Sequence, residues 1–93
     1  MTAEFTIDAL ELETMEDVHA RFLQALNLPA YYGRNLDALY DCLTDLTGET
    51  VLRLLHPAAL EDRLGPRGRA LRALLRRAAE ENPRFTLLEE PGE

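Results

Sequence analysis

Residues 28–45 read Leu-Pro-Ala-Tyr-Tyr-Gly-Arg-Asn-Leu-Asp-Ala-Leu-Tyr-Asp-Cys-Leu-Thr-Asp and predict a short loop followed by a helix. Pro29 and Gly33 bracket two tyrosines that we expect to be exposed. Asn35 is placed to accept a hydrogen bond from the first free backbone N–H groups of a helix, so the helix should begin directly after it. Apolar and aromatic side chains then recur at the spacing of one helical face: Leu36, Leu39, Tyr40 and Leu43.

Three aspartates recur every four residues on another face of this helix. Like charges at this spacing cost an isolated helix roughly 0.2–0.5 kcal/mol per pair. Asp45 also lies near the negative end of the helix dipole, where a carboxylate is disfavoured, while Asp37 and Asp41 precede it on the same stripe. A solvated acidic face without a role is one interpretation. The adjacent tyrosines favour another, a binding surface for a basic protein, because aromatic rings are common at such surfaces.

The segment from Leu28 to Thr44 resembles the corresponding segment of the barstar-like ribonuclease inhibitors. The shared pattern is Leu-Pro-x-Tyr-Tyr-Gly-x-Asn-Leu-Asp-Ala-Leu-Tyr-Asp-Cys-Leu-Thr, which is long and has no gaps. The rest of the chain matches less closely, with its elements in the same order, so the resemblance covers about residues 3–89. It implies an α/β fold in which a small three-stranded parallel sheet packs with four helices. We expect one domain over residues 1–93, with an acidic tail at 90–93.

The resemblance also implies a binding surface. In that family the loop and the second helix plug the active-site cleft of a ribonuclease, and Asp41 corresponds to the aspartate that takes the place of a substrate phosphate. Asp37 would be the second anion, and Tyr31 an aromatic anchor. The implied partner-binding residues are Tyr31, Tyr32, Gly33, Asn35, Leu36, Asp37, Tyr40, Asp41, Thr44 and Asp45. A secondary set consists of Arg34, Leu46 and Arg77.

Three positions depart from the family's pattern. Tyr40 stands where the inhibitor has Trp, a modest change in the same role. Arg34 and Arg77 stand where it has Glu, so two acids have become cations on or near the implied interface. These departures favour, as the partner, a related nuclease with a shifted charge pattern over barnase itself.

Composition and charge limit the classes of function. The 93 residues carry a net charge of −7, which disfavours nucleic acid as a partner. The sign is uneven, because residues 1–62 sum to −9 and residues 63–88 to +5. The single cysteine excludes an internal disulfide and fits a reducing cytoplasm. The chain shows neither a signal-peptide pattern nor a membrane-spanning apolar run, so we expect a soluble cytoplasmic protein.

Patterning outside the central stretch predicts strands alternating with helices. Residues 4–8 alternate as a short strand, and Thr14 with Asp17 makes an approximate capping box for a helix that stops near Asn27. Strand 50–55 is almost continuously apolar, which suggests cover on both faces. Residues 58–64 predict a short helix with Pro57 at its first position, and the last helix should open at Arg67 or Gly68. Residues 84–88 predict the third strand, and Glu89 should begin a frayed tail.

Sites for catalysis, metals and nucleic acid find little support. The chain has no serine, and Cys42 with His19 or His56 is the remaining nucleophile and base pair, although a packed thiol is the simpler interpretation. The three aspartates span about 12 Å along a helix, too far to hold one metal ion. A cluster of arginines, Arg69, Arg72, Arg76 and Arg77, could touch RNA. We favour a solvated face with Arg76–Glu80 and Arg77–Glu81 pairs. No cofactor is expected.

We therefore expect a non-enzymatic intracellular inhibitor, of the immunity or antitoxin type, that blocks a barnase-like or related basic ribonuclease. It would be a monomer when free and would form a 1:1 complex with the nuclease. The alternative is a regulatory interaction module of the same fold that binds a non-nuclease protein.

Overall fold

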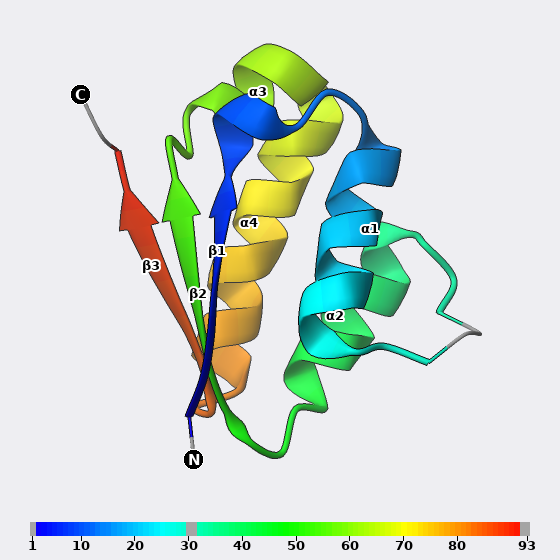
Figure 1. Cartoon of the computed structure of the whole chain (residues 1–93), viewed down its shortest axis with the longest axis vertical. Coiled ribbons are helices and arrows are strands. Elements are labelled where there is room, and N and C mark those ends of the chain that lie inside the picture. The colour runs from blue at the N-terminus through cyan, green and yellow to red at the C-terminus, as the bar shows by residue number, and fades with distance from the viewer. Residues whose placement is uncertain (1, 30–31, 92–93) are drawn as a thin grey trace.

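A three-stranded parallel sheet carries the fold of this computed structural model, which describes residues 2–29 and 32–91 (Figure 1). The elements in chain order are β1 (Thr2–Asp8), the 3-10 turn η1 (Ala9–Glu11), α1 (Met15–Leu26), α2 (Leu36–Thr44), β2 (Glu49–Leu55), α3 (Ala59–Leu64), α4 (Pro66–Glu81) and β3 (Phe85–Glu90). The predicted α/β fold with three parallel strands and four helices is confirmed.

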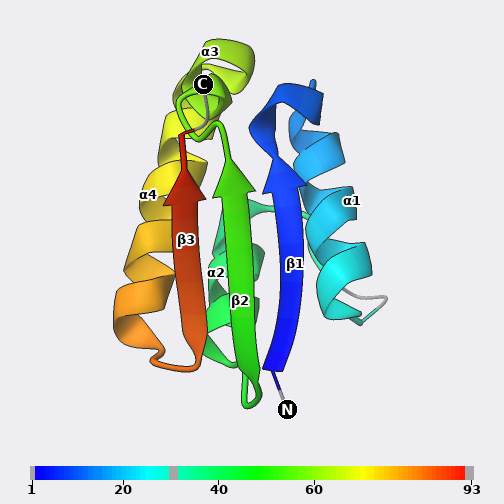
Figure 2. The same ribbon diagram turned by 60° about the vertical axis from the view of Figure 1, so that its left-hand side comes forward.

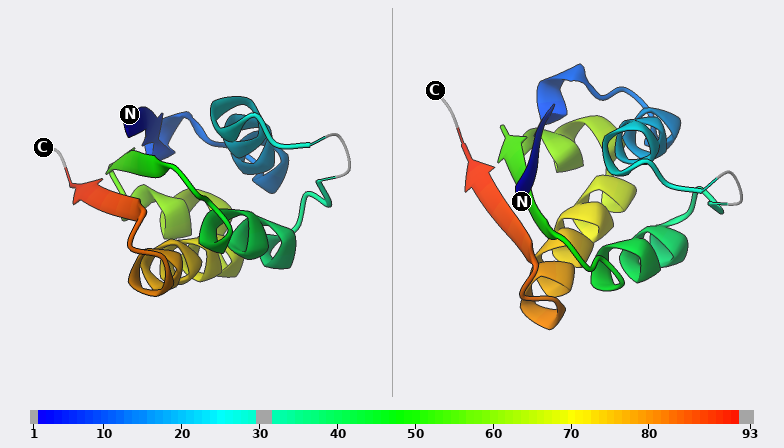
Figure 3. Two further views of the ribbon diagram at one scale, coloured as in Figure 1. Left: turned by 90° about the horizontal axis from the view of Figure 1, so that it is seen from below. Right: turned by 60° about the horizontal axis from the view of Figure 1, so that its bottom comes forward.

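The strands lie side by side in sequence order, with β2 in the centre (Figure 2). Both crossover connections step in the same direction across the sheet, and crossovers keep one hand, so their helices lie against one face. Figure 3 shows α1, α2 and α4 on that side of the strands. The expectation of cover on both faces of β2 is wrong, because buried Leu52 and Leu54 alternate with exposed Arg53.

The core fills the space between the covered face of the sheet and the helices. Phe5 of β1 meets Phe22 of α1 edge to face, with ring centroids 5.9 Å apart. The largest fully buried side chains come from every layer of the domain: Leu12, Val18, Phe22, Leu39, Leu43, Leu52, Leu54, Leu60, Leu71, Leu75 and Phe85. Two α2 leucines on this list fix the orientation of that helix relative to the core.

The predicted start and end of α1 are confirmed. Thr14 Oγ1 accepts from the Asp17 backbone N–H at 3.2 Å, and the Asp17 carboxylate accepts from the Thr14 N–H at 3.1 Å, which completes the capping box. Hydrogen bonds from the backbone N–H groups of Glu13 and Thr14 lower the pKa of Asp17. Asn27 ends the helix in the left-handed conformation, at a φ of 54°.

The carboxyl-terminal expectations need correction. β3 continues to Glu90, so Glu89 and Glu90 belong to the sheet and not to a frayed tail. Glu89 pairs with Arg72 at 2.8 Å and with Arg76 at 2.6 Å, and Glu90 pairs with Arg53 at 2.7 Å. The pairs with Arg76 and Arg72 lower the pKa of Glu89. All three pairs hold the end of the strand. Arg76 therefore does not make the predicted pair with its helical neighbour Glu80.

Two helix starts also differ from expectation. Pro57 is not the first residue of α3, because His56 adopts a positive φ of 54° and a turn separates it from the helix at Ala59. Helix α4 begins at Pro66, one residue before the predicted Arg67, with proline at the position where a missing backbone N–H costs nothing. No helix in the described ranges is long and apolar enough to cross a membrane.

Candidate protein-binding surface

The acidic stripe, which consists of Asp37, Asp41 and Asp45, lies on the outer side of α2. Asn35 begins this helix as predicted, since its Oδ1 accepts from the Ala38 backbone N–H at 2.8 Å. Asp37, Asp41 and Asp45 are all exposed. Within the described part of the chain none of their carboxylates forms an ion pair or accepts a side-chain hydrogen bond. Three carboxylates are thus available to a partner.

Tyr40 lies on the same helix and meets a cation from α4. The guanidinium carbon of Arg77 lies 5.6 Å from the centroid of the Tyr40 ring. The ring is half-buried and also packs against the core cluster. The predicted secondary residue Arg77 is therefore brought next to the predicted primary residue Tyr40, and its predicted pairing with Glu81 is not found in the described residues.

Tyr32 corrects the expectation of two exposed tyrosines, since only 7% of it is exposed. Its hydroxyl forms a 2.6 Å hydrogen bond with Nδ1 of His19, which is itself buried in α1. Burial raises the pKa of Tyr32 to about 12 and lowers the pKa of His19. Tyr32 thus anchors the loop to α1. Tyr31, the predicted aromatic anchor, lies outside the described residues.

The other predicted site residues have differing exposures. Gly33 and Arg34 are exposed in the loop, and Arg34 adopts a positive φ of 53°. The Thr44 hydroxyl donates to the Tyr40 carbonyl at 2.9 Å, so it is turned back onto its own helix. Leu36 and Leu46 are half-buried and pack against the core, which leaves part of each side chain accessible.

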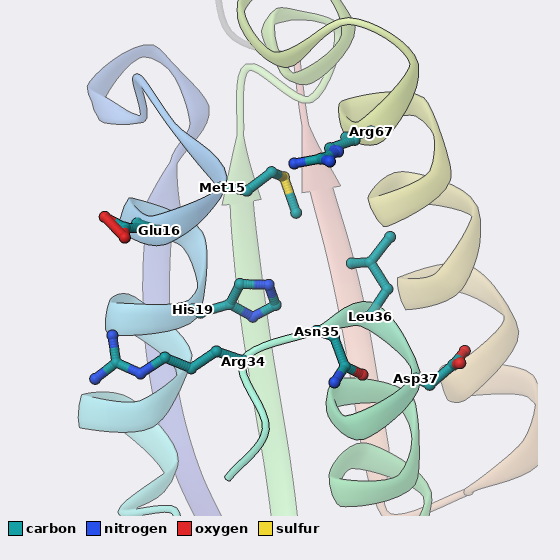
Figure 4. Close-up of a pocket in the computed structure, with 8 residues that line it drawn as sticks. All are labelled: Met15, Glu16, His19, Arg34, Asn35, Leu36, Asp37 and Arg67. Carbon is teal, nitrogen blue, oxygen red and sulfur yellow. The ribbon is translucent and has the colours of Figure 1, made fainter.

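A cavity of about 570 Å³ opens between α1, the loop and the first turns of α2 and α4 (Figure 4). Met15, Leu36 and the Arg67 guanidinium point into it, and the His19 ring forms part of its wall. Glu16 and Asp37 border it with their carboxylates directed outward (Figure 4). Its lining is mixed in character, because apolar side chains stand beside two arginines, Arg34 and Arg67.

A second, shallower hollow lies between the loop and the outer side of α2. It is lined by Leu28, Pro29, Tyr32, Gly33, Ala38, Asp41, Cys42 and Asp45. Apolar loop residues therefore stand beside two of the three exposed carboxylates. This arrangement suits an interface that has a desolvated centre next to charged groups.

The candidate nucleophile and base are not assembled. Burial, with Asp41 and Asp45 nearby, raises the pKa of the Cys42 thiol, which is the opposite of what activates a catalytic cysteine. His19 is hydrogen-bonded to Tyr32, and His56 Nδ1 lies 2.9 Å from an Asp8 carboxylate oxygen. The described residues contain no cluster of three potential metal ligands.

Asn82 fixes the end of α2, a role that sequence reasoning missed. Its side-chain amide, buried just after α4, donates to the carbonyl of Leu43 at 2.9 Å and to that of Leu46 at 3.1 Å. Its Oδ1 accepts from the Arg84 backbone N–H at 3.0 Å. An asparagine before proline signals the end of a helix, but no local signal indicates a contact 39 residues away.

Asn82→Ala should therefore lower the free energy of unfolding by about 2–3 kcal/mol, because the carbonyls at the end of α2 lose a buried donor. Urea unfolding followed by circular dichroism measures this. Gln24→Ala, which truncates an exposed amide on α1, should stay within about 0.5 kcal/mol of the unmodified protein. Equal effects of the two substitutions would refute the structural role of Asn82.

Comparison with known proteins identifies the family. The family model described as "Barstar (barnase inhibitor)" matches residues 2–89. A Bacillus subtilis (strain 168) protein named "Putative ribonuclease inhibitor YrdF" is 53% identical over 38 residues, which are 41% of this chain and 42% of that protein. The match thus spans less than half of the relative's length. Members of the family are non-enzymatic inhibitors, in agreement with the expectation that this chain is not an enzyme. The chain belongs to the barstar (barnase inhibitor) family.

Proposed function

We propose that this protein inhibits a barnase-type ribonuclease by inserting the outer side of α2 and the preceding loop into the active-site cleft. In the 1:1 complex the Asp37 and Asp41 carboxylates occupy positions that RNA phosphates would otherwise take. The observation that supports this most directly is that both carboxylates are exposed, on one short helix, without an ion pair in the described residues.

The fixed position of α2 suits this role. Asn35 caps the first turn, Leu39 and Leu43 are buried beneath the helix, and Asn82 holds its last turn. Binding therefore requires little ordering of the helix, which limits the entropic cost of forming the complex. Charge also helps, because a cationic cleft and an acidic surface attract each other before contact and speed association.

We place this inhibitor in the cytoplasm, as the immunity partner of a nuclease that would otherwise damage the cell. The thiol of Cys42 is compatible with a reducing compartment. A cationic nuclease cleft, built to hold phosphates, would accept carboxylates through charge-assisted hydrogen bonds from arginine or histidine.

The test is a titration of purified barnase-type ribonucleases, barnase included, against a fluorescent RNA substrate. We expect at least one enzyme of the panel to lose its activity at one equivalent of this protein. The target ribonuclease is the enzyme of the panel that is inhibited most tightly. A basic ribonuclease of unrelated fold serves as control, because nonspecific capture of basic proteins would inhibit both. Failure to inhibit any member of the panel, even in large excess, would overturn the proposal.

A further inference from the structure

The arginines of α4 divide into two groups. Arg69 pairs with Glu61, and Arg72 and Arg76 both pair with Glu89. Arg67 and Arg77 make no ion pair with any described residue. The first group neutralises acids on α3 and β3. The second group lies toward α2, with Arg67 at the cavity in Figure 4 and Arg77 at the Tyr40 ring.

Arg77 stands at the edge of the acidic stripe. Tyr40, on whose ring it lies, directly precedes Asp41 and follows Asp37 by three residues, which is almost one helical turn. A cation over an aromatic ring is attracted by the negative face of the ring, which favours one position of the side chain. Among the described residues the Arg77 guanidinium donates no hydrogen bond, so its N–H donors are open to a partner.

We infer that the partner bears a carboxylate that pairs with Arg77, beside the cationic groups that receive Asp37 and Asp41. This inference rests on the proposed function and narrows it to nucleases whose basic cleft has an acidic rim at this point. A partner surface that is basic throughout would repel the Arg77 guanidinium when the partner covers Tyr40. A carboxylate would satisfy the N–H donors that binding removes from water, so the residue would select among related nucleases.

The experiment measures inhibition constants against the target ribonuclease at 0.15 M salt. Arg77→Glu should raise the constant at least about tenfold, and Arg77→Gln, which removes the charge while keeping a hydrogen-bonding chain, about threefold. Arg63→Glu is the matched control, because Arg63 is also exposed without a described ion pair but lies on α3, and it should change the constant less than twofold. Thermal unfolding of each variant verifies the fold.

The direction in which Arg77→Glu changes the inhibition constant distinguishes a nuclease with an acidic rim from one with a uniformly basic rim. Against a uniformly basic rim Arg77→Glu would tighten binding, and that result, or no change, would overturn the inference while leaving the proposed inhibition intact. Conversion of single Asp or Glu residues around the cleft of the target ribonuclease to Arg completes the test. One such change should weaken binding of the unmodified protein and restore binding of Arg77→Glu. If no such residue exists, the inference fails.

Discussion

Asp41→Ala is expected to raise the inhibition constant against the target ribonuclease by at least about thirtyfold, or about 2 kcal/mol, the effect of a residue at the centre of an interface. Asp41 lies near the middle of α2, directly after Tyr40, and lines the hollow beside the loop. In the proposed complex it loses its water on all sides and gains the cationic groups of the cleft. Its truncation would leave those groups buried without a counter-charge.

Asp45→Ala provides the comparison, because it removes the same carboxylate from the same stripe. Asp45 is the residue that ends α2, at the edge of the surface, where water still screens the charge. Its truncation should weaken binding by less than about 1 kcal/mol and should mainly slow association. Small, equal effects of the two substitutions would contradict the role assigned to Asp41.

Neither aspartate substitution should disturb the fold. Both side chains are exposed and have no described ion pair, so the free energy of unfolding should change by less than about 0.5 kcal/mol. Removing Asp41 even relieves part of the repulsion between like charges four residues apart. A loss of inhibition can therefore be attributed to the contact itself.

Features that depend on neighbours within about four residues were predictable from sequence. Thr14 with Asp17 and Asn35 with Ala38 form the caps that their spacing indicates, because a cap needs only its own first turn. The acidic stripe of α2 was predictable for the same reason. Helical periodicity alone places Asp37 and Asp41 on one side and Leu39 and Leu43 toward the core.

Features that depend on distant partners were not predictable. A proline and a glycine around Tyr32 indicate an exposed loop, but its hydroxyl finds His19, 13 residues earlier, and the ring is buried. Arg76 has a helical neighbour of opposite charge, yet it pairs with Glu89 across the α4–β3 turn. The spacing of residues in the sequence indicates only partners that are close along the chain. The tertiary fold decides which partner a side chain contacts.

The largest effect on stability is expected at Gly68, where α3 and α4 touch. Gly68→Ala should lower the free energy of unfolding by about 3 kcal/mol or more. A Cβ atom at this buried position would lie 1.9 Å from the Leu60 carbonyl oxygen and 3.0 Å from the Leu64 Cβ. In an exposed helix the same substitution would raise the free energy of unfolding by about 1 kcal/mol. A decrease would therefore be due to the steric clash.

The two helices cannot easily move apart to relieve this contact. A single residue, Gly65, both ends α3 and precedes α4, and its φ of 66° with ψ of −142° is accessible only to glycine. A shift of α4 would also pull on Asn82 at its far end, which holds α2. Because a domain of this size is stable by only about 5–15 kcal/mol, 3 kcal/mol would lower the melting temperature by about 12 °C or more.

Gly48→Ala is the matched control for the Gly68 experiment. A Cβ at Gly48 would meet no atom within 4 Å, and its φ is not positive, so alanine should be neutral or should stabilise by up to about 1 kcal/mol through the unfolded chain. Differential scanning calorimetry gives the melting temperatures of the two variants. Both carry the same glycine-to-alanine change, and only the one at position 68 introduces a steric clash. If Gly68→Ala melts within about 2 °C of Gly48→Ala, the helices separate at little cost, and the close contact at Leu60 does not stabilise the fold.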